Sequence, residues 1–302
     1  MATDIDATAL PHDPLWPRAG GWPSVTPGAQ YDAVLVGVPT WRTSLSPTQA
    51  HATPAAVRAA LDRYSPALVS PGPHDLTHAR AFADAGDIVD PDGDEGEARV
   101  RSRCADLAQR SGLVIAVGGD NSLTCPVALG VDAAGLITLD AHYDLRDGVS
   151  NGSPVRRLIE AGMDPRRIAQ IGISDFANSA AYARRAQELG ITVITVDDVR
   201  DRGIAAAVNT ALAVAGAGRG GIHLDIDVDV CDRSVAPGCP ASVPGGLAAW
   251  ELRKLVRLIG SHTSVRSADI VEVDATADAA DGRTVRLAAL CILELLAGKA
   301  LT

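Results

Sequence analysis

The sequence predicts a single three-layer α/β/α domain built around a mainly parallel β-sheet. Short apolar runs rich in β-branched residues alternate with longer segments rich in Ala, Leu and Arg, as in repeated βα units. Of the 302 residues, 47% are apolar and only 3% are aromatic, so the core must consist mainly of Ala, Val, Leu and Ile. We expect an irregular N-terminal extension over 1–30 and one domain over 31–302.

Seven segments have the length and composition of buried strands. Each is a short apolar run bounded by polar or turn-forming residues. The predicted strands are 32–38, 113–117, 135–140, 168–173, 191–196, 222–228 and 266–273. Because helical segments separate them, we expect these strands to pair in parallel.

Eight segments between and after these strands have helical patterns. The predicted helices are 54–63, 95–110, 122–130, 154–162, 178–189, 203–216, 248–259 and 283–298. Pro54 and Pro154 suit first-turn positions, where the missing N–H has no intrahelical partner. Asn178 and the serine that follows it indicate a capped helix start.

The charge pattern excludes a nucleic-acid-binding role. The formal net charge is −10, and the 27 basic residues are scattered along the predicted helices instead of forming a stripe. The chain has no apolar run of the roughly 18 residues that a membrane span needs, and its N-terminus lacks the pattern of a secretory signal. Five cysteines without CxxC spacing favour a reducing compartment. We therefore expect a cytoplasmic protein with neither nucleic-acid nor membrane partners.

Acidic residues and one histidine follow the apolar strand runs, which is where open α/β sheets bind ligands. Asp140 and His142 lie two residues apart, so both face the same side of extended backbone. Asp144 can fold back toward them if the strand ends near Tyr143. The sequence therefore predicts two carboxylates and one imidazole around a common point.

A second acidic cluster follows another strand. Asp227 and Asp229 share one face, and Asp225 lies in the same register. Carboxylates gathered at an apolar strand end repel one another, so a bound cation is the natural compensation. A single DxD pair is often only a turn, but two clusters together indicate one or two divalent ions. Mixed oxygen and nitrogen donors suit Mn²⁺.

These segments resemble the ureohydrolase superfamily of arginase, agmatinase and formimidoylglutamase, with motifs GGDHS, DAHxD and DxDxxDPxxxPG. The matching segments here are 118–122, 140–144 and 227–238. The resemblance implies an arginase-like fold and a site for two Mn²⁺ ions. Its implied ligands are Asp140, His142, Asp144, Asp227, Asp229 and Asn121. Asn121 stands where the family's commonest motif has histidine, so one ion should be bound more weakly.

The segments 151–157, 170–182 and 236–246 are most similar to bacterial formimidoylglutamase. The resemblance implies hydrolysis of N-formimidoyl-L-glutamate to L-glutamate and formamide, a step of histidine degradation. A histidine that precedes the corresponding segment in agmatinase-like members is absent here, which disfavours a strongly basic guanidine. We expect Asn151 to bind the substrate, together with Arg156 or Arg157, because the expected substrate carries two carboxylates.

The same resemblance assigns the other roles at the site. Asp144 is expected to transfer a proton and Glu272 to contact the amidinium group. Asp120 and Asp232 are expected to support the metal ligands without binding metal themselves.

Two alternatives remain open from the sequence. The chain could instead hydrolyse a guanidino compound and release urea. It could also be a metal-depleted binding or regulatory relative, because Asn121 replaces a ligand and the shuttle histidine is missing. Trimers and hexamers are common in the family, so we expect a homo-oligomer with a small-molecule substrate.

Overall fold

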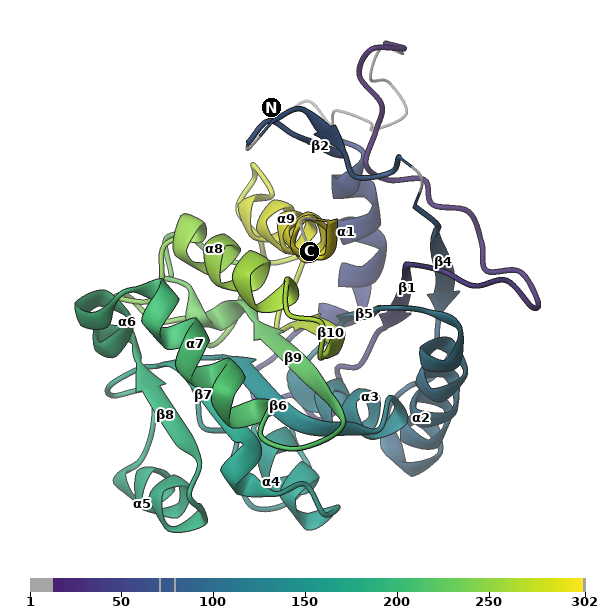
Figure 1. Ribbon diagram of the computed structural model, residues 1–302. Helices are drawn as coiled ribbons and strands as arrows, with labels where there is room; N and C mark the ends of the chain where they lie inside the picture. Colours follow the sequence, from purple (N-terminus) through teal and green to yellow (C-terminus); the bar gives the residue numbers. More distant parts are fainter. Residues whose placement is uncertain (1–12, 71, 79, 301–302) are drawn as a thin grey trace.

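The computed structural model describes residues 13–70, 72–78 and 80–300. An eight-stranded sheet runs through its centre in the order β4-β1-β5-β10-β9-β6-β7-β8 (Figure 1). All neighbouring strands pair in parallel. The strands are β4 (Phe82–Asp87), β1 (Ala33–Val38), β5 (Val114–Gly118), β10 (Val265–Val271), β9 (Gly221–Asp227), β6 (Ala133–Leu139), β7 (Ile168–Ile173) and β8 (Thr192–Thr195). The predicted parallel sheet is confirmed.

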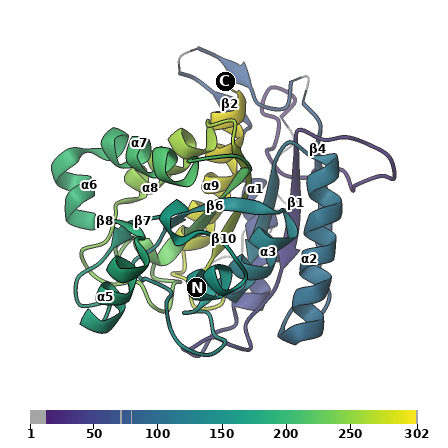
Figure 2. The same cartoon turned by 60° about the horizontal axis from the view of Figure 1, so that its bottom comes forward.

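Helices cover both faces of this sheet, so the predicted three-layer architecture is also confirmed (Figure 2). One face is covered by α1 (Thr53–Leu61), α6 (Val196–Arg202), α7 (Ile204–Ala215), α8 (Ala249–Gly260) and α9 (Arg283–Ala300). The other is covered by α2 (Gly93–Arg110), α3 (Thr124–Gly130), α4 (Pro154–Glu160) and α5 (Ala180–Leu189). Pro54 and Pro154 lie in first turns as expected, and the Ser179 side chain caps α5.

All seven predicted strands are present, with bounds within two residues of those expected. The sequence prediction misses β4, which pairs with β1 at the sheet edge and has alternating acidic and small residues instead of an apolar run. It also misses α6, whose start is stabilised by reciprocal hydrogen bonds between Thr195 and Asp198. A short antiparallel pair, β2 (Ala67–Leu68) and β3 (His74–Asp75), lies outside the main sheet.

The described part of the N-terminal segment runs beside the sheet edge. Ser24 forms an isolated bridge with Asp84 of β4, and the Val25 N–H donates to the Asp84 carbonyl at 3.2 Å. Residues 1–12 of the predicted extension lie outside the described residues, and the boundary at residue 31 stays a prediction. Within the described residues, no helix has the length and apolar character needed to cross a membrane.

Candidate metal centre

Four adjacent strands deliver polar side chains to one edge of the sheet. Asn121 follows β5, Glu272 follows β10, Asp227 ends β9 and Asp140 follows β6. Because these strands are parallel neighbours, their carboxyl ends meet at the same edge of the sheet. A cavity of about 470 Å³ opens there, and its lining includes His142 and Glu272. The sheet topology therefore unites motifs that are far apart in the chain.

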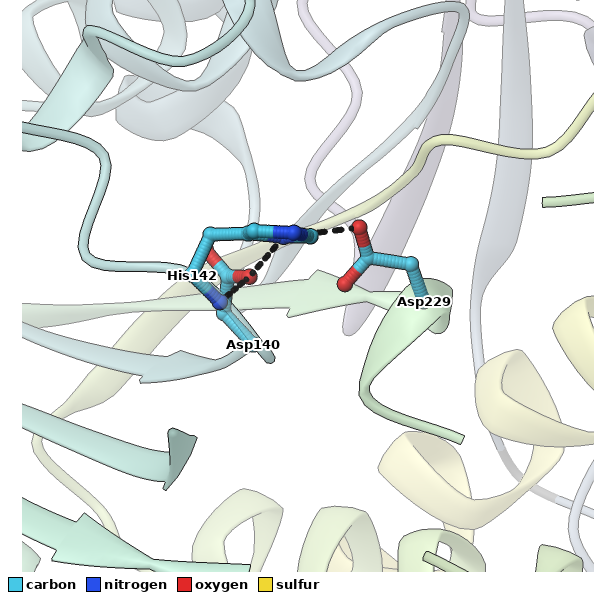
Figure 3. Close-up of side chains that lie close together, drawn as sticks. All are labelled: Asp140, His142 and Asp229. Carbon is cyan, nitrogen blue, oxygen red and sulfur yellow. Dashed lines mark hydrogen bonds and ion pairs between the residues drawn. The ribbon is translucent and has the colours of Figure 1, made fainter. Parts of the chain in front are cut away.

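Asp140, His142 and Asp229 form the first group of metal-ligand side chains. One ligand atom of each lies within 4.8 Å of the others. The His142 Nδ1 atom lies 3.0 Å from Asp229 Oδ2 and 3.4 Å from Asp140 Oδ1 (Figure 3). The buried Asp140 Oδ2 atom has no hydrogen-bond partner among the described residues. These three side chains fit a shared cation.

A second group adjoins the first. The Asn121 Nδ2 atom lies 2.6 Å from Asp144 Oδ2 and 3.4 Å from Asp227 Oδ2. On its other side, Asn121 Oδ1 accepts a hydrogen bond of 2.6 Å from Thr124 Oγ1. A half-turn of this amide would direct its oxygen to the pocket, because the Thr124 hydroxyl can accept as well as donate. Asn121 therefore fits the place of an oxygen ligand.

Two pocket carboxylates stand on unusual backbone. Asp144 has φ of 53° and Glu272 has φ of 63°, a region that residues other than glycine seldom occupy. The Glu272 N–H donates to the Gly119 carbonyl at 2.9 Å, and Glu272 Oε1 accepts from the Asn121 N–H at 2.7 Å. Such backbone costs about 1–3 kcal/mol per residue and persists only where surrounding contacts hold it, as these two hydrogen bonds hold Glu272.

The electrostatics of the pocket favour cations. Burial, and then the charge of Asp140, raises the pKa of Asp144 well above its ordinary value. Burial, and then the charge of Asp120, raises the pKa of Glu272 to about 8. The charge of Asp229 is the largest cause that raises the pKa of His142 to about 12. Clustered carboxylates with one imidazole therefore match the donors and the charge that divalent cations such as Mn²⁺ require.

The two expected supporting residues, Asp120 and Asp232, and the expected substrate residue Asn151 differ in how close they come to this centre. Asp120 is buried and caps the 3₁₀ turn Asn121–Leu123 through a bond of 3.2 Å from the Ser122 N–H. Asn151 lines the pocket and donates to Glu272 Oε1 at 2.9 Å. Asp232 instead accepts from the Gly245 N–H at 2.6 Å and organises the loop after the Asp227–Asp229 motif.

The structure places the two expected substrate arginines elsewhere. Arg157 forms an ion pair of 2.6 Å with Glu97 on α2. Arg156 donates to the carbonyl oxygens of Arg146 and Gly148. Neither arginine is among the described residues that line the pocket. Each guanidinium is instead bound by the protein groups named above.

Arg146 does line the pocket, and the sequence analysis misses it. It lies only two positions beyond Asp144, in the loop that follows the 140–144 motif. That short separation in the sequence is the signal that could have placed Arg146 at the pocket. Thr124, the partner of Asn121, is also missed, because its contact depends on the packing of α3 against the site.

Residues 31–298 match the arginase family, and the chain belongs to it. This membership agrees with the parallel α/β sheet described above and with the motifs at its strand ends.

Individual relatives narrow the comparison. The chain is 35% identical over 279 residues to formimidoylglutamase of Halalkalibacterium halodurans, covering 88% of this chain and 86% of that protein. It is 32% identical over 305 residues to guanidinopropionase of Pseudomonas aeruginosa, covering 97% and 94%.

Solved structures of relatives are similar to this chain over most of its length. The crystal structure of formimidoylglutamase from Bacillus subtilis superposes with a TM-score of 0.90 at 30% identity, covering 98% of this chain and 96% of that one. The structure of Trypanosoma cruzi formiminoglutamase with Mn²⁺ superposes with a TM-score of 0.81 at 25% identity, covering 89% and 94%.

Proposed function

We propose that the protein is a manganese-dependent hydrolase that converts N-formimidoyl-L-glutamate to L-glutamate and formamide. The observation that carries the proposal is the pair of ligand groups at one sheet edge, with Asn121 completing the second group. The similarity to formimidoylglutamases over most of the chain supports this choice of substrate.

Each ligand group would hold one cation. Asp140, His142 and Asp229 would bind the first, and Asn121, Asp144 and Asp227 would adjoin the second. When bound, two divalent cations supply a water molecule that loses a proton near neutral pH without a strong protein base. An amide is a neutral ligand, so we expect the group that contains Asn121 to bind its cation more weakly.

The chain's own carboxylates would then handle the substrate. Glu272 uses Oε1 for its bonds to Asn121 and Asn151, so Oε2 is available to pair with the amidinium group. Asp144 would accept a proton from the attacking water and pass it to the departing nitrogen. The water oxygen bonds to the amidine carbon, the bond from that carbon to the glutamate nitrogen breaks, and formamide and glutamate separate.

The test is product identification with the purified, full-length protein reconstituted with manganese. We expect formamide and glutamate in equal amounts from N-formimidoyl-L-glutamate, and no turnover after the metal has been removed by chelation. Metal analysis should give about two manganese ions per chain at saturation. A protein that binds no manganese and hydrolyses no amidine would instead support a binding or regulatory role.

A guanidino acid is the second candidate substrate, because guanidinopropionase of Pseudomonas aeruginosa covers nearly the whole chain. The same assay distinguishes the two. Faster release of urea from 3-guanidinopropionate than of formamide from N-formimidoyl-L-glutamate would assign the protein to guanidino compounds.

We further propose that the enzyme works in the cytoplasm as a homo-oligomer. All five cysteines are buried and unpaired, which is consistent with a reducing compartment. Light scattering of the purified protein would measure the oligomeric state directly.

A further inference from the structure

Two side-chain amides hold the short backbone segment that joins His142 to Asp144. The Tyr143 N–H donates to Asn178 Oδ1 at 3.0 Å, and the Tyr143 carbonyl accepts from Gln170 Nε2 at 3.1 Å. Both hydrogen-bonding groups of the Tyr143 backbone are therefore bound by side chains of β7 and of the loop that follows it. Because Tyr143 lies between two expected metal ligands, a shift of its backbone would turn both ligand side chains.

Asn178 uses both ends of its amide on the protein. Its Nδ2 atom donates to the Ala141 carbonyl at 2.8 Å and to the Ser174 carbonyl at 3.2 Å, while Oδ1 accepts from the Tyr143 N–H. The Ser174 N–H also donates to the Ala141 carbonyl, at 3.0 Å. Asn178 lines the pocket, but both of its N–H donors and its oxygen already bind backbone groups. It is therefore suited to hold this loop and not to bind a substrate.

Gln170 is a polar residue in an apolar strand. All six residues of β7 are buried, and Gln170 has no exposed surface. Among the described residues its Oε1 atom has no hydrogen-bond partner, which costs stability in a buried amide. Its Nε2 atom donates to the Tyr143 carbonyl, and reversing the amide would bring two carbonyl oxygens together. An apolar residue at this position would avoid the unpaired oxygen but could not hold Tyr143.

The backbone held in this way includes the left-handed conformation of Asp144. Its φ of 53° persists only where neighbouring contacts fix the peptide groups on both sides. Gln170 fixes the peptide group before Asp144 through the Tyr143 carbonyl, and the Arg156 N–H donates to the Asp144 carbonyl at 3.2 Å. Without the bond from Gln170 that peptide group would turn more freely. The Asp144 carboxylate would then leave its place 2.6 Å from Asn121 Nδ2.

We infer that Asn178 and Gln170 are positioning residues for the candidate metal centre, an inference that rests on the proposed function. Asn178 fixes the peptide group that joins His142 to Tyr143, and Gln170 fixes the one that joins Tyr143 to Asp144. One amide thus orients a ligand of the first group, and the other orients a ligand of the second group. Removing a side chain that orients a metal ligand commonly lowers metal affinity about 10- to 100-fold.

The first test is calorimetric titration of the chelator-treated, full-length protein with manganese chloride. We expect Asn178→Ala to raise the Kd of the tighter ion, and Gln170→Met to raise that of the weaker ion, each about 10-fold or more. Gln170→Met keeps the length of the side chain and removes the amide. The matched controls are Asn209→Ala on α7 and Gln187→Met on α5, which change exposed residues outside the pocket lining and should keep the parent values.

The absorption spectrum of the cobalt(II)-substituted protein separates positioning from a general loss of stability, because it reports the geometry of the ligands around the ion. At saturating cobalt we expect shifted bands in Asn178→Ala and Gln170→Met and parent spectra in both controls. At saturating manganese, kcat should fall about 10-fold in each variant, with KM changed less than about 3-fold. Parent spectra in both variants, even with a lower metal-free Tm, would overturn the inference.

Metal binding also separates this inference from the proposed reaction, because it is measured without a substrate. Manganese binding that weakens in Asn178→Ala and Gln170→Met, in a protein that hydrolyses no amidine, would contradict the proposed function alone. Amidine hydrolysis with manganese affinity and cobalt spectra unchanged in both variants would contradict this inference alone.

Discussion

The two faces of the central sheet are built from the same strands and differ in how they are packed. On the face covered by α1, α6, α7, α8 and α9, buried side chains form one continuous apolar cluster. On the face covered by α2, α3, α4 and α5, the apolar residues form two separate clusters. Strand β9 shows the cause, because Leu224 and Ile226 join the continuous cluster while Asp225 and Asp227 point to the other face.

Buried polar residues occupy the gap between the two clusters. His223 lies 2.8 Å from Ser267 Oγ through Nδ1 and 3.0 Å from Asp269 Oδ2 through Nε2. All three are fully buried, so this group has no access to a substrate. Register pairs continue the row from Asp269 through Asp225 to Thr138.

This row is incompletely satisfied. Among the described residues, Thr138 Oγ1, both carboxylate oxygens of Asp225 and Asp269 Oδ1 are buried without a hydrogen-bond partner. Each such group costs about 1–3 kcal/mol relative to a paired one. The comparison teaches that one face supplies stability while the other gives up apolar packing to carry the candidate metal ligands at its edge.

The largest expected effect is on the polar face. We expect Asp140→Ala to lower kcat/KM about 1,000-fold or more, because it removes a ligand of the first group and several kcal/mol of catalytic stabilisation. Steady-state kinetics measures the loss of activity, and metal analysis measures the loss of bound manganese. Asp201→Ala, which removes an exposed carboxylate of α6, is the control and should retain both. Full activity in Asp140→Ala would refute the site.

On the apolar face, Leu224→Ala should act on stability alone. Leu224 is fully buried, so we expect the free energy of unfolding to fall by about 3 kcal/mol. Denaturant titration measures it, with Leu15→Ala as the exposed counterpart that should change little. If Leu224→Ala also lost manganese at temperatures where it stays folded, the functional separation of the faces would fail.

Asp227→Asn should change stability in the opposite direction. Burial, and then the charge of Asp229, raises the pKa of Asp227, so its ionised form is disfavoured in the folded, metal-free protein. We expect the amide to raise the metal-free free energy of unfolding by about 1 kcal/mol. It should also reduce the rise in Tm on adding manganese, because the group that adjoins the second ion loses a carboxylate while Asp140, His142 and Asp229 are kept. Thermal unfolding with and without manganese tests both expectations. A metal-free Tm below that of the parent would contradict the expected repulsion between Asp227 and the neighbouring carboxylates.

The smallest expected effects come from two threonines. Thr138→Val removes an unpaired hydroxyl, so we expect a gain of about 1 kcal/mol with activity retained. Thr124→Val removes the partner of Asn121 Oδ1, so we expect a loss of about 1 kcal/mol and weaker binding of one manganese ion. Calorimetric unfolding and manganese titration compare the two variants. Equal changes in the free energy of unfolding and in manganese affinity would show that the hydrogen bond between Thr124 and Asn121 has no effect.

The spacing of residues within single strands predicts which side chains share a face. The alternation along 222–228 already divides apolar from acidic side chains, because successive residues of a strand face opposite sides. The same rule brings Asp140 and His142 to one side of a strand end. The sequence alone therefore predicted the main strands and the layers, and it placed the candidate ligand residues at strand ends, where their role as metal ligands stays a prediction.

Tertiary structure decided which of these segments meet. The order β5-β10-β9-β6 brings Asn121, Glu272, Asp227 and Asp140 to one edge, and no local pattern encodes that order. It also decided that Arg146 faces the pocket while Arg156 and Arg157 do not, since the choice depends on which acceptors lie within reach of each guanidinium. Spacing sets directions within one element, but contacts between elements depend on how the whole chain packs.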